Sequence, residues 1–112
     1  MRTSLLIGAA IALWAAAIGH AAAAEPQEAT IKLFQFQPKV LEIKAGTTVK
    51  WLNGDDIEHS VTAGAPGKES GAFDSGFFKK GGSFEFTFQQ PGTYEYFCRR
   101  HNSMKATVTV TQ

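Results

Sequence analysis

The chain has one cysteine, Cys98, which is followed at spacings of three and six by His101 and Met104. A thiolate, an imidazole and a thioether are all ligands that a soft metal ion accepts. A further imidazole, His59, lies far upstream in the stretch WLNGDDIEHSVT. If the fold brings it to the same place, the four side chains form a His₂Cys set with a weak axial methionine. Such a set is typical of a blue-copper electron-transfer site.

Copper requires this mixture of ligands because its two oxidation states prefer different surroundings. Imidazoles serve Cu(II), whereas thiolate and thioether sulfur favour Cu(I). A site that offers both kinds of ligand, and that cannot rearrange much, changes oxidation state with little nuclear motion. The four side chains therefore predict one copper ion per chain and rapid one-electron transfer between Cu(I) and Cu(II).

The same residues fit a buried core, a zinc site or a hydrolase less well. A lone cysteine at a strand end is often a small buried hydrophobic side chain, and a lone methionine is often part of a core. Structural zinc takes four nitrogen or sulfur ligands and rarely a thioether, so Met104 argues against zinc. A cysteine hydrolase would activate Cys98 through His59 or His101, but no obvious oxyanion turn follows the cysteine. We expect a metal site and no enzymatic activity.

The first 24 residues have the features of a secretory signal peptide. Arg2 precedes an apolar run at residues 5–18, and the alanines at 22–24 offer a cleavage site. The run is shorter than the ~20 residues that a membrane-spanning helix needs. The mature chain is therefore expected to begin at Glu25 and to be periplasmic.

Residues 25–112 are enough for one small domain and too few for two. Without Arg2, ten Lys and Arg side chains balance ten Asp and Glu side chains. This balance, with no long run of either charge, argues against a nucleic-acid or membrane surface. A single cysteine excludes an intramolecular disulfide, although exported domains of this size often have one. The domain is expected to be a monomer.

The domain is predicted to be all-β, because turn residues interrupt it at short intervals and no segment keeps an apolar helical period. The predicted strands are residues 30–34, 40–44, 48–52, 60–62, 83–88, 93–98 and 106–111. Residues 63–71, AGAPGKESG, are expected to form a loop. Alternation in SFEFTF and TYEYFC indicates the core-facing side chains. These are Phe84, Phe86, Phe88, Tyr94, Tyr96 and Cys98.

Strands of this number and size favour a Greek-key β-sandwich of two sheets. At one pole of such a sandwich, the ends of strands that are distant in sequence meet. A histidine that enters one strand can then face a loop that leaves another, which would bring His59 to the loop after Cys98. The carboxylates of Asp55, Asp56 and Glu58 lie in a glycine-containing turn and are expected to be solvated charge.

The stretch PGTYEYFCRRHNSM closely resembles the ligand loop of the cupredoxins, the small blue-copper proteins, and within them the plastocyanin and amicyanin branch. Its short gap between histidine and methionine is similar to that of amicyanins. The stretch VKWLNGDDIEHSV is similar to the family's asparagine-containing strand and turn before the first histidine. The resemblance covers nearly all of residues 25–112. It implies an eight-stranded Greek-key sandwich with copper at one pole.

The resemblance also implies roles for individual residues. The copper ligands would be His59, Cys98, His101 and Met104. The imidazole of His101 would be exposed at the surface, where electrons enter and leave. Asn53 would tie the two ligand-bearing segments together by hydrogen bonds. The backbone N–H of Ser60 would donate to the sulfur of Cys98. Bonds of this kind orient the ligands and tune the reduction potential.

The ligand loop departs from the family pattern, which usually has a small hydroxyl residue after the cysteine and prolines beside the histidine. Here these positions are Arg99, Arg100, Asn102 and Ser103. Copper ligation survives the change, but the collar around His101 becomes polar and basic. The expected partners are redox proteins that dock near this histidine, and the likeness to amicyanins points to a quinoprotein dehydrogenase and a c-type cytochrome. The alternative function is copper binding and delivery in the periplasm.

Two roles are open to the two arginines of this loop. They either steer an anionic oxidant or an acidic partner to the copper pole, or they only solvate the loop or pair with nearby carboxylates such as Glu58 or Asp56.

Overall fold

The structure is a computed structural model that describes residues 25–112, so the proposed signal peptide lies outside the described residues. The elements are β1 (Gln27–Lys32), β2 (Gln35–Gln37), β3 (Val40–Lys44), β4 (Thr47–Asn53), β5 (Thr62–Ala65), β6 (Lys68–Asp74), β7 (Ser83–Phe88), β8 (Gly92–Phe97) and β9 (Lys105–Thr111). Within this part of the chain, no helix is long and apolar enough to cross a membrane.

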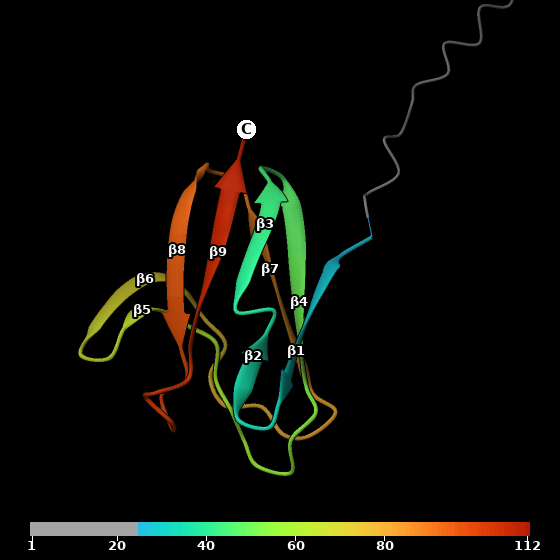
Figure 1. Cartoon of the computed structure of the whole chain (residues 1–112), viewed down its shortest axis with the longest axis vertical. Coiled ribbons are helices and arrows are strands. Elements are labelled where there is room, and N and C mark those ends of the chain that lie inside the picture. The colour runs from blue at the N-terminus through green and yellow to red at the C-terminus, as the bar shows by residue number, and fades with distance from the viewer. Residues whose placement is uncertain (1–24) are drawn as a thin grey trace, which may run out of the picture.

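The strands form two sheets, which confirms the predicted all-β sandwich (Figure 1). One sheet has the order β2-β1-β4-β7 and the other has the order β3-β9-β8-β5-β6. Most neighbours are antiparallel, but β1 pairs with β4 and β3 pairs with β9 in parallel. Neighbours that are distant in sequence are typical of a Greek-key arrangement. The described residues form nine strands, where the family resemblance implied eight.

The core between the sheets is built around Trp51, which is fully buried. Its ring stacks on Phe73 and Phe84, and its Nε1–H donates to the hydroxyl of Tyr96 at 3.2 Å. Phe88, Tyr96 and Cys98 are buried as the alternation predicted, whereas Phe84, Phe86 and Tyr94 are partly buried against the same core. Stacked and edge-on aromatic side chains are therefore a large part of the core between the two sheets.

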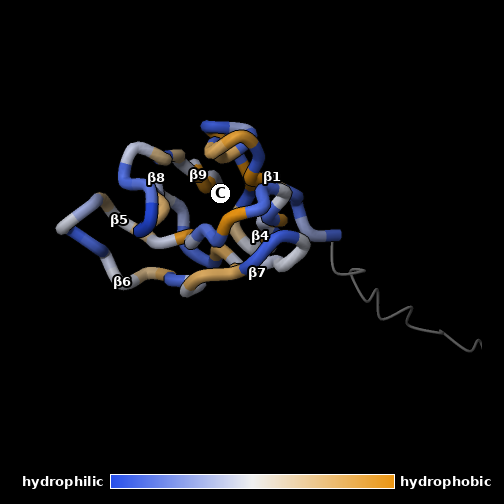
Figure 2. The backbone as a smooth tube through the Cα atoms, turned by 90° about the horizontal axis from the view of Figure 1, so that it is seen from below, coloured by the Kyte–Doolittle hydropathy of each residue, from blue (hydrophilic) through white to orange (hydrophobic). Residues whose placement is uncertain are grey.

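The predicted loop at residues 63–71 is wrong, because these residues form most of the hairpin of β5 and β6. Both views show the hairpin projecting to one side of the sandwich (Figures 1 and 2). β6 is an edge strand whose residues are nearly all exposed, so its sequence has no alternation to recognise. The register of β5 also shifts between Thr62 and Gly64. The predicted strand at 60–62 overlaps β5 only at Thr62.

The predicted strand at 30–34 is too long, because β1 ends at Lys32. Leu33 and Phe34 have φ angles of 53° and 58°, and β2 then runs back antiparallel to β1. The left-handed region is uncommon for residues other than glycine. The backbone N–H groups of both residues donate to the carboxylate of Asp55.

Candidate metal centre

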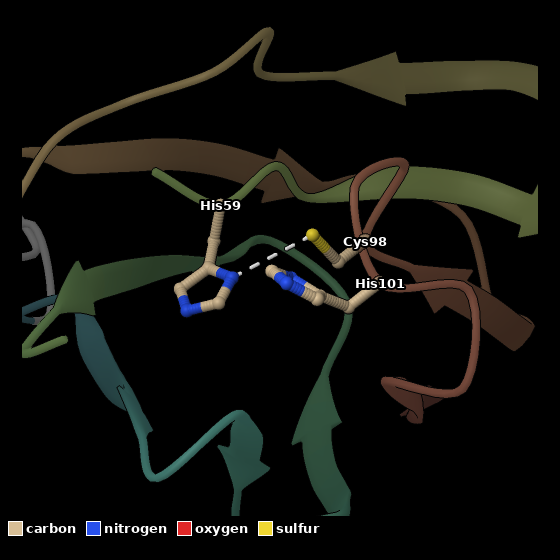
Figure 3. Close-up of side chains that lie close together, drawn as sticks. All are labelled: His59, Cys98 and His101. Carbon is tan, nitrogen blue, oxygen red and sulfur yellow. Dashed lines mark hydrogen bonds between the residues drawn. The ribbon is translucent and has the colours of Figure 1, made fainter. Parts of the chain in front are cut away.

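The ligand atoms of His59, Cys98 and His101 all lie within 4.8 Å of one another. Figure 3 shows the three side chains converging, His59 from the segment before β5 and the other two from the loop after β8, with Nδ1 of His59 at 3.7 Å from Sγ of Cys98. His59 and Cys98 are fully buried, and His101 is half-buried. The pole of the sandwich thus brings the upstream histidine to the loop after Cys98, as the sandwich topology predicted.

The loop between β8 and β9 places Cys98, His101 and Met104 by its own backbone hydrogen bonds. The N–H of Cys98 donates to the carbonyl oxygen of Met104 at 3.1 Å. The N–H of Met104 donates to the carbonyl oxygen of His101 at 2.8 Å. Met104 is buried in the core cluster directly before β9. A loop closed in this way has little freedom, so its side chains keep their relative positions.

The imidazole of His101 shows that the site suits a metal ion. Its Nδ1 is buried and has no hydrogen-bond partner within residues 25–112. Buried polar atoms are nearly always paired, because an unpaired one loses its interaction with water. A lone pair that is buried beside a thiol and a second imidazole is free to bind copper, for which this mixture of nitrogen and sulfur is suited.

Asp55 fixes the orientation of the other histidine. One carboxylate oxygen of Asp55 lies 2.9 Å from Nε2 of His59. Because a carboxylate only accepts hydrogen bonds, Nε2 must hold the proton, and Nδ1 of a neutral imidazole is then left with its lone pair. That lone pair is on the nitrogen nearer to Cys98. His59 can therefore bind a metal ion through the lone pair of Nδ1.

The backbone of Leu33 and Phe34 holds this carboxylate in turn. The N–H of Leu33 donates to Oδ1 of Asp55 at 2.8 Å, and the N–H of Phe34 donates to Oδ2 at 2.9 Å. Successive N–H groups in such a turn make a small anion-binding concavity. Burial alone would raise the pKa of Asp55, but hydrogen bonds from Phe34, His59 and Leu33 outweigh it and hold the pKa below its usual value.

Asp55 is therefore a correction to the expectation that the acidic side chains near His59 are solvated. It is only 8% exposed, whereas Asp56 is exposed and pairs with Lys80 at 2.7 Å. The sequence does place Asp55 four residues before His59. It does not distinguish this carboxylate from Asp56, because the difference depends on a backbone turn more than twenty residues upstream.

Asn53 holds the loop before His59 but makes a different connection from the one expected. Its side-chain amide donates to the carbonyl oxygens of Ile57 and Phe78, and its Oδ1 accepts from the N–H of Asp55. Its side chain thus fastens the histidine loop to the segment before β7. The described bonds of this side chain do not reach the Cys98 loop, so the expected tie between ligand segments is wrong.

Ser60 makes the connection between the two ligand segments. Its backbone N–H donates to Sγ of Cys98 at 3.4 Å, as the resemblance implied. Its hydroxyl also accepts a hydrogen bond from the backbone N–H of Arg99 at 2.9 Å. The residue after the upstream histidine is therefore bonded both to the cysteine and to the residue that follows it.

The collar around His101 is less polar than the loop sequence suggested. The ring of Phe34, half-exposed, stands edge-on to His101 with centroids 4.9 Å apart, and it also contacts the ring of His59. Leu33 beside it is 72% exposed. Arg99 pairs with Asp74 at 2.6 Å, and not with Glu58 or Asp56. The surface at this pole thus combines exposed apolar side chains from the β1–β2 turn with the charge of Arg100.

Comparisons with known proteins agree with this geometry. A family profile described as copper binding proteins of the plastocyanin/azurin family matches residues 23–111. Amicyanin from Paracoccus versutus is 36% identical over 96 residues, which cover 80% of this chain and 70% of that protein. Amicyanin-alpha from Methylorubrum extorquens is 33% identical over 103 residues, which cover 91% of this chain and 86% of that protein. The solved structure of a purple cupredoxin from Nitrosopumilus maritimus has a TM-score of 0.70 at 31% identity, covering 76% of this chain and 99% of that one.

Proposed function

This chain belongs to the plastocyanin/azurin family of copper binding proteins, and we propose that it is a periplasmic type 1 blue-copper protein that carries single electrons between redox partners. The observation that carries the proposal is the convergence of the ligand atoms of His59, Cys98 and His101 within 4.8 Å. The periplasmic location is supported by the signal-like sequence of the first 24 residues.

The proposed equatorial ligands are Nδ1 of His59, Sγ of Cys98 and Nδ1 of His101, and Met104 is the proposed weak axial ligand. Copper supplies a reversible one-electron couple when it is bound. The protein supplies rigidity, because Asp55 holds one imidazole and backbone bonds close the loop that carries the other ligands. Ligands that move little between oxidation states favour fast electron transfer over chemistry on a substrate.

His101 is the proposed point at which electrons enter and leave. It is the half-buried member of the three converging side chains, and the exposed ring of Phe34 packs against it. A partner that docks on Phe34 and Leu33 would exclude water beside this imidazole. Such an apolar contact fits a brief encounter between a monomeric carrier and other redox proteins. Family analogy supports a quinoprotein dehydrogenase and a c-type cytochrome as these partners.

The charges near the loop favour an acidic partner. Lys39 and Lys105 line a hollow beside Met104, and Arg100 lies in the loop itself. All three side chains are exposed, and none of them makes an ion pair within residues 25–112. Unpaired surface charge of one sign attracts an oppositely charged partner and raises its association rate, and added salt screens this attraction.

Electron self-exchange tests this function against copper delivery. NMR line widths of mixed Cu(I) and Cu(II) protein give the self-exchange rate, and a chelator competition gives the rate of copper loss. An electron carrier is expected to exchange electrons quickly and to retain its copper over the same period. Slow exchange together with ready transfer of copper to the chelator would instead identify a copper-delivery protein.

A further inference from the structure

We propose that Arg99 and Asp74 are positioning residues, which act through Ser60 on the thiolate of Cys98. The ion pair between Nη2 of Arg99 and Oδ2 of Asp74 is 2.6 Å long. It joins the residue directly after Cys98 to the last residue of β6, which belongs to the projecting hairpin. Pairing with a carboxylate is one of the roles that the sequence left open for Arg99, although the carboxylate is Asp74 and not Glu58 or Asp56.

A chain of hydrogen bonds through Ser60 and Thr62 also connects the backbone of Arg99 to the carboxylate of Asp74. The backbone N–H of Arg99 donates to Oγ of Ser60 at 2.9 Å, and that oxygen lies 3.0 Å from Oγ1 of Thr62. The hydroxyl of Thr62 donates to Oδ1 of Asp74 at 3.2 Å. The guanidinium of Arg99 then closes the ring on the other oxygen of the same carboxylate.

The hydrogens of this ring can point in only one direction. A hydroxyl has one hydrogen, and that of Thr62 is directed to Asp74, so the hydroxyl hydrogen of Ser60 must be donated to Thr62. Ser60 can then accept the N–H of Arg99 without competition. The carboxylate is the acceptor that sets this order, because it has no hydrogen to donate. Asp74 therefore determines how the buried hydroxyl of Ser60 is used.

The hydroxyl of Ser60 matters because the N–H of the same residue donates to Sγ of Cys98. Ser60 and Thr62 are almost fully buried, so water does not replace a lost partner there. If the ring opens, Arg99 and Ser60 lose a constraint on their separation, and the N–H of Ser60 is held less firmly against the sulfur. Hydrogen bonds to this sulfur tune the reduction potential of such sites.

Hydrogen exchange of the copper-free protein tests the coupling without any metal. The reporter is the amide of Ser60, whose intrinsic exchange rate is unaffected because residues 59 and 60 stay unchanged. Arg99→Gln and Asp74→Asn are each expected to speed its exchange, by up to about fivefold for a half-exposed ion pair. The double variant is expected to add little to either single variant, because both remove the same interaction.

Three controls keep this measurement specific. Arg100→Gln removes an equal charge from the next residue and is expected to leave Ser60 exchange unchanged. Arg99→Lys keeps the charge and is expected to restore part of the protection. The amide of Val108 in strand β9, which lies between β3 and β8, reports global unfolding, so an effect of the ion pair must be larger at Ser60 than at Val108. Equal acceleration at both amides, or none at Ser60, would overturn the proposal.

The reduction potential of the copper-loaded variants gives a second readout, which rests on the proposed function. Charge alone would lower the potential in Arg99→Gln and raise it in Asp74→Asn, because a nearby positive charge favours the added electron. Loss of the Ser60 hydrogen bond lowers it in both, since that bond stabilises negative charge on the sulfur. We expect the potential to fall in both variants. Shifts of opposite sign would overturn the proposal, whereas failure to bind copper would instead refute the proposed function and leave the exchange test standing.

Discussion

The carboxylate of Asp55 lies 2.9 Å from Nε2 of His59, and Nδ1 on the other side of the same ring lies 3.7 Å from Sγ of Cys98. The same carboxylate accepts two backbone N–H groups from the turn between β1 and β2. A carboxylate four residues before the histidine thus joins the loop of His59 to the turn between β1 and β2. In the left-handed backbone of Leu33 and Phe34, both N–H groups point to this one side chain.

Asp55→Ala is expected to weaken both copper binding and the fold. It leaves the buried imidazole of His59 without its acceptor, which costs about 1–3 kcal/mol, and it also removes the acceptor of two part-buried backbone N–H groups. Loss of a residue that orients a metal-bound histidine typically lowers metal affinity by about 10- to 100-fold. Cu(I) competition with a chelator and urea unfolding of the copper-free domain measure the two effects. Asp56→Ala, at the exposed neighbouring carboxylate, is the control, and an equal loss in both variants would refute this role.

Met104→Leu is expected to keep the colour of the copper protein and to raise its potential. The axial thioether is a weak ligand that stabilises the oxidised ion more than the reduced one. Leucine conserves the volume of this buried side chain, so the fold should lose less than about 1.5 kcal/mol. Visible spectra and voltammetry check both parts. Disappearance of the charge-transfer band, or a lowered potential, would show that Met104 does not have the axial role.

Arg100→Glu is expected to change reaction rates and leave the visible spectrum unchanged. Oxidation of the Cu(I) protein by an anionic small-molecule oxidant should slow, and oxidation by a cationic one should quicken. Both differences should shrink as salt shortens the Debye length to ~8 Å at physiological strength. Lys50→Glu is the control, because Lys50 lies opposite Glu85 in the pairing of β4 with β7, away from the ligand loop. Equal rates for wild type and Arg100→Glu at low salt would leave Arg100 as solvated surface.

Tyr96 is expected to make the fold sensitive to strongly alkaline solution. Burial raises the pKa of its hydroxyl to about 12, although the hydrogen bond from Trp51 opposes the shift. In the unfolded chain the hydroxyl ionises near its ordinary value of 10.0, so the contribution of Tyr96 to stability is present below that pH and is lost as pH rises toward 12. The unfolding free energy should fall by about 1.4 kcal/mol per pH unit in this window. Tyr96→Phe should remove this slope, and an unchanged slope would contradict the assignment.

The ligand loop could be predicted from sequence because its chemistry is local. Three side chains within one hairpin connection keep their spacing whatever surrounds them, and strand ends meet at the pole of a sandwich. Asp55 could not be singled out, since its burial depends on a turn that is distant in sequence. The strand β6 was missed for a different reason, because an exposed edge strand has no hydrophobic alternation. The pairing of Arg99 with Asp74 follows from the position of that same strand.

The central claim is that Cys98 is a ligand of a blue-copper centre formed with His59, His101 and Met104. The measurement that tests it most directly is the addition of one equivalent of Cu(II) to the purified domain of residues 25–112, followed by visible and EPR spectroscopy of wild type and of Cys98→Ser. Wild type should develop an intense thiolate-to-copper band at one copper per chain, and Cys98→Ser should lack it because the Cu–S bond is gone. A blue Cys98→Ser protein, or a wild-type domain that takes up copper without this band, would contradict the account.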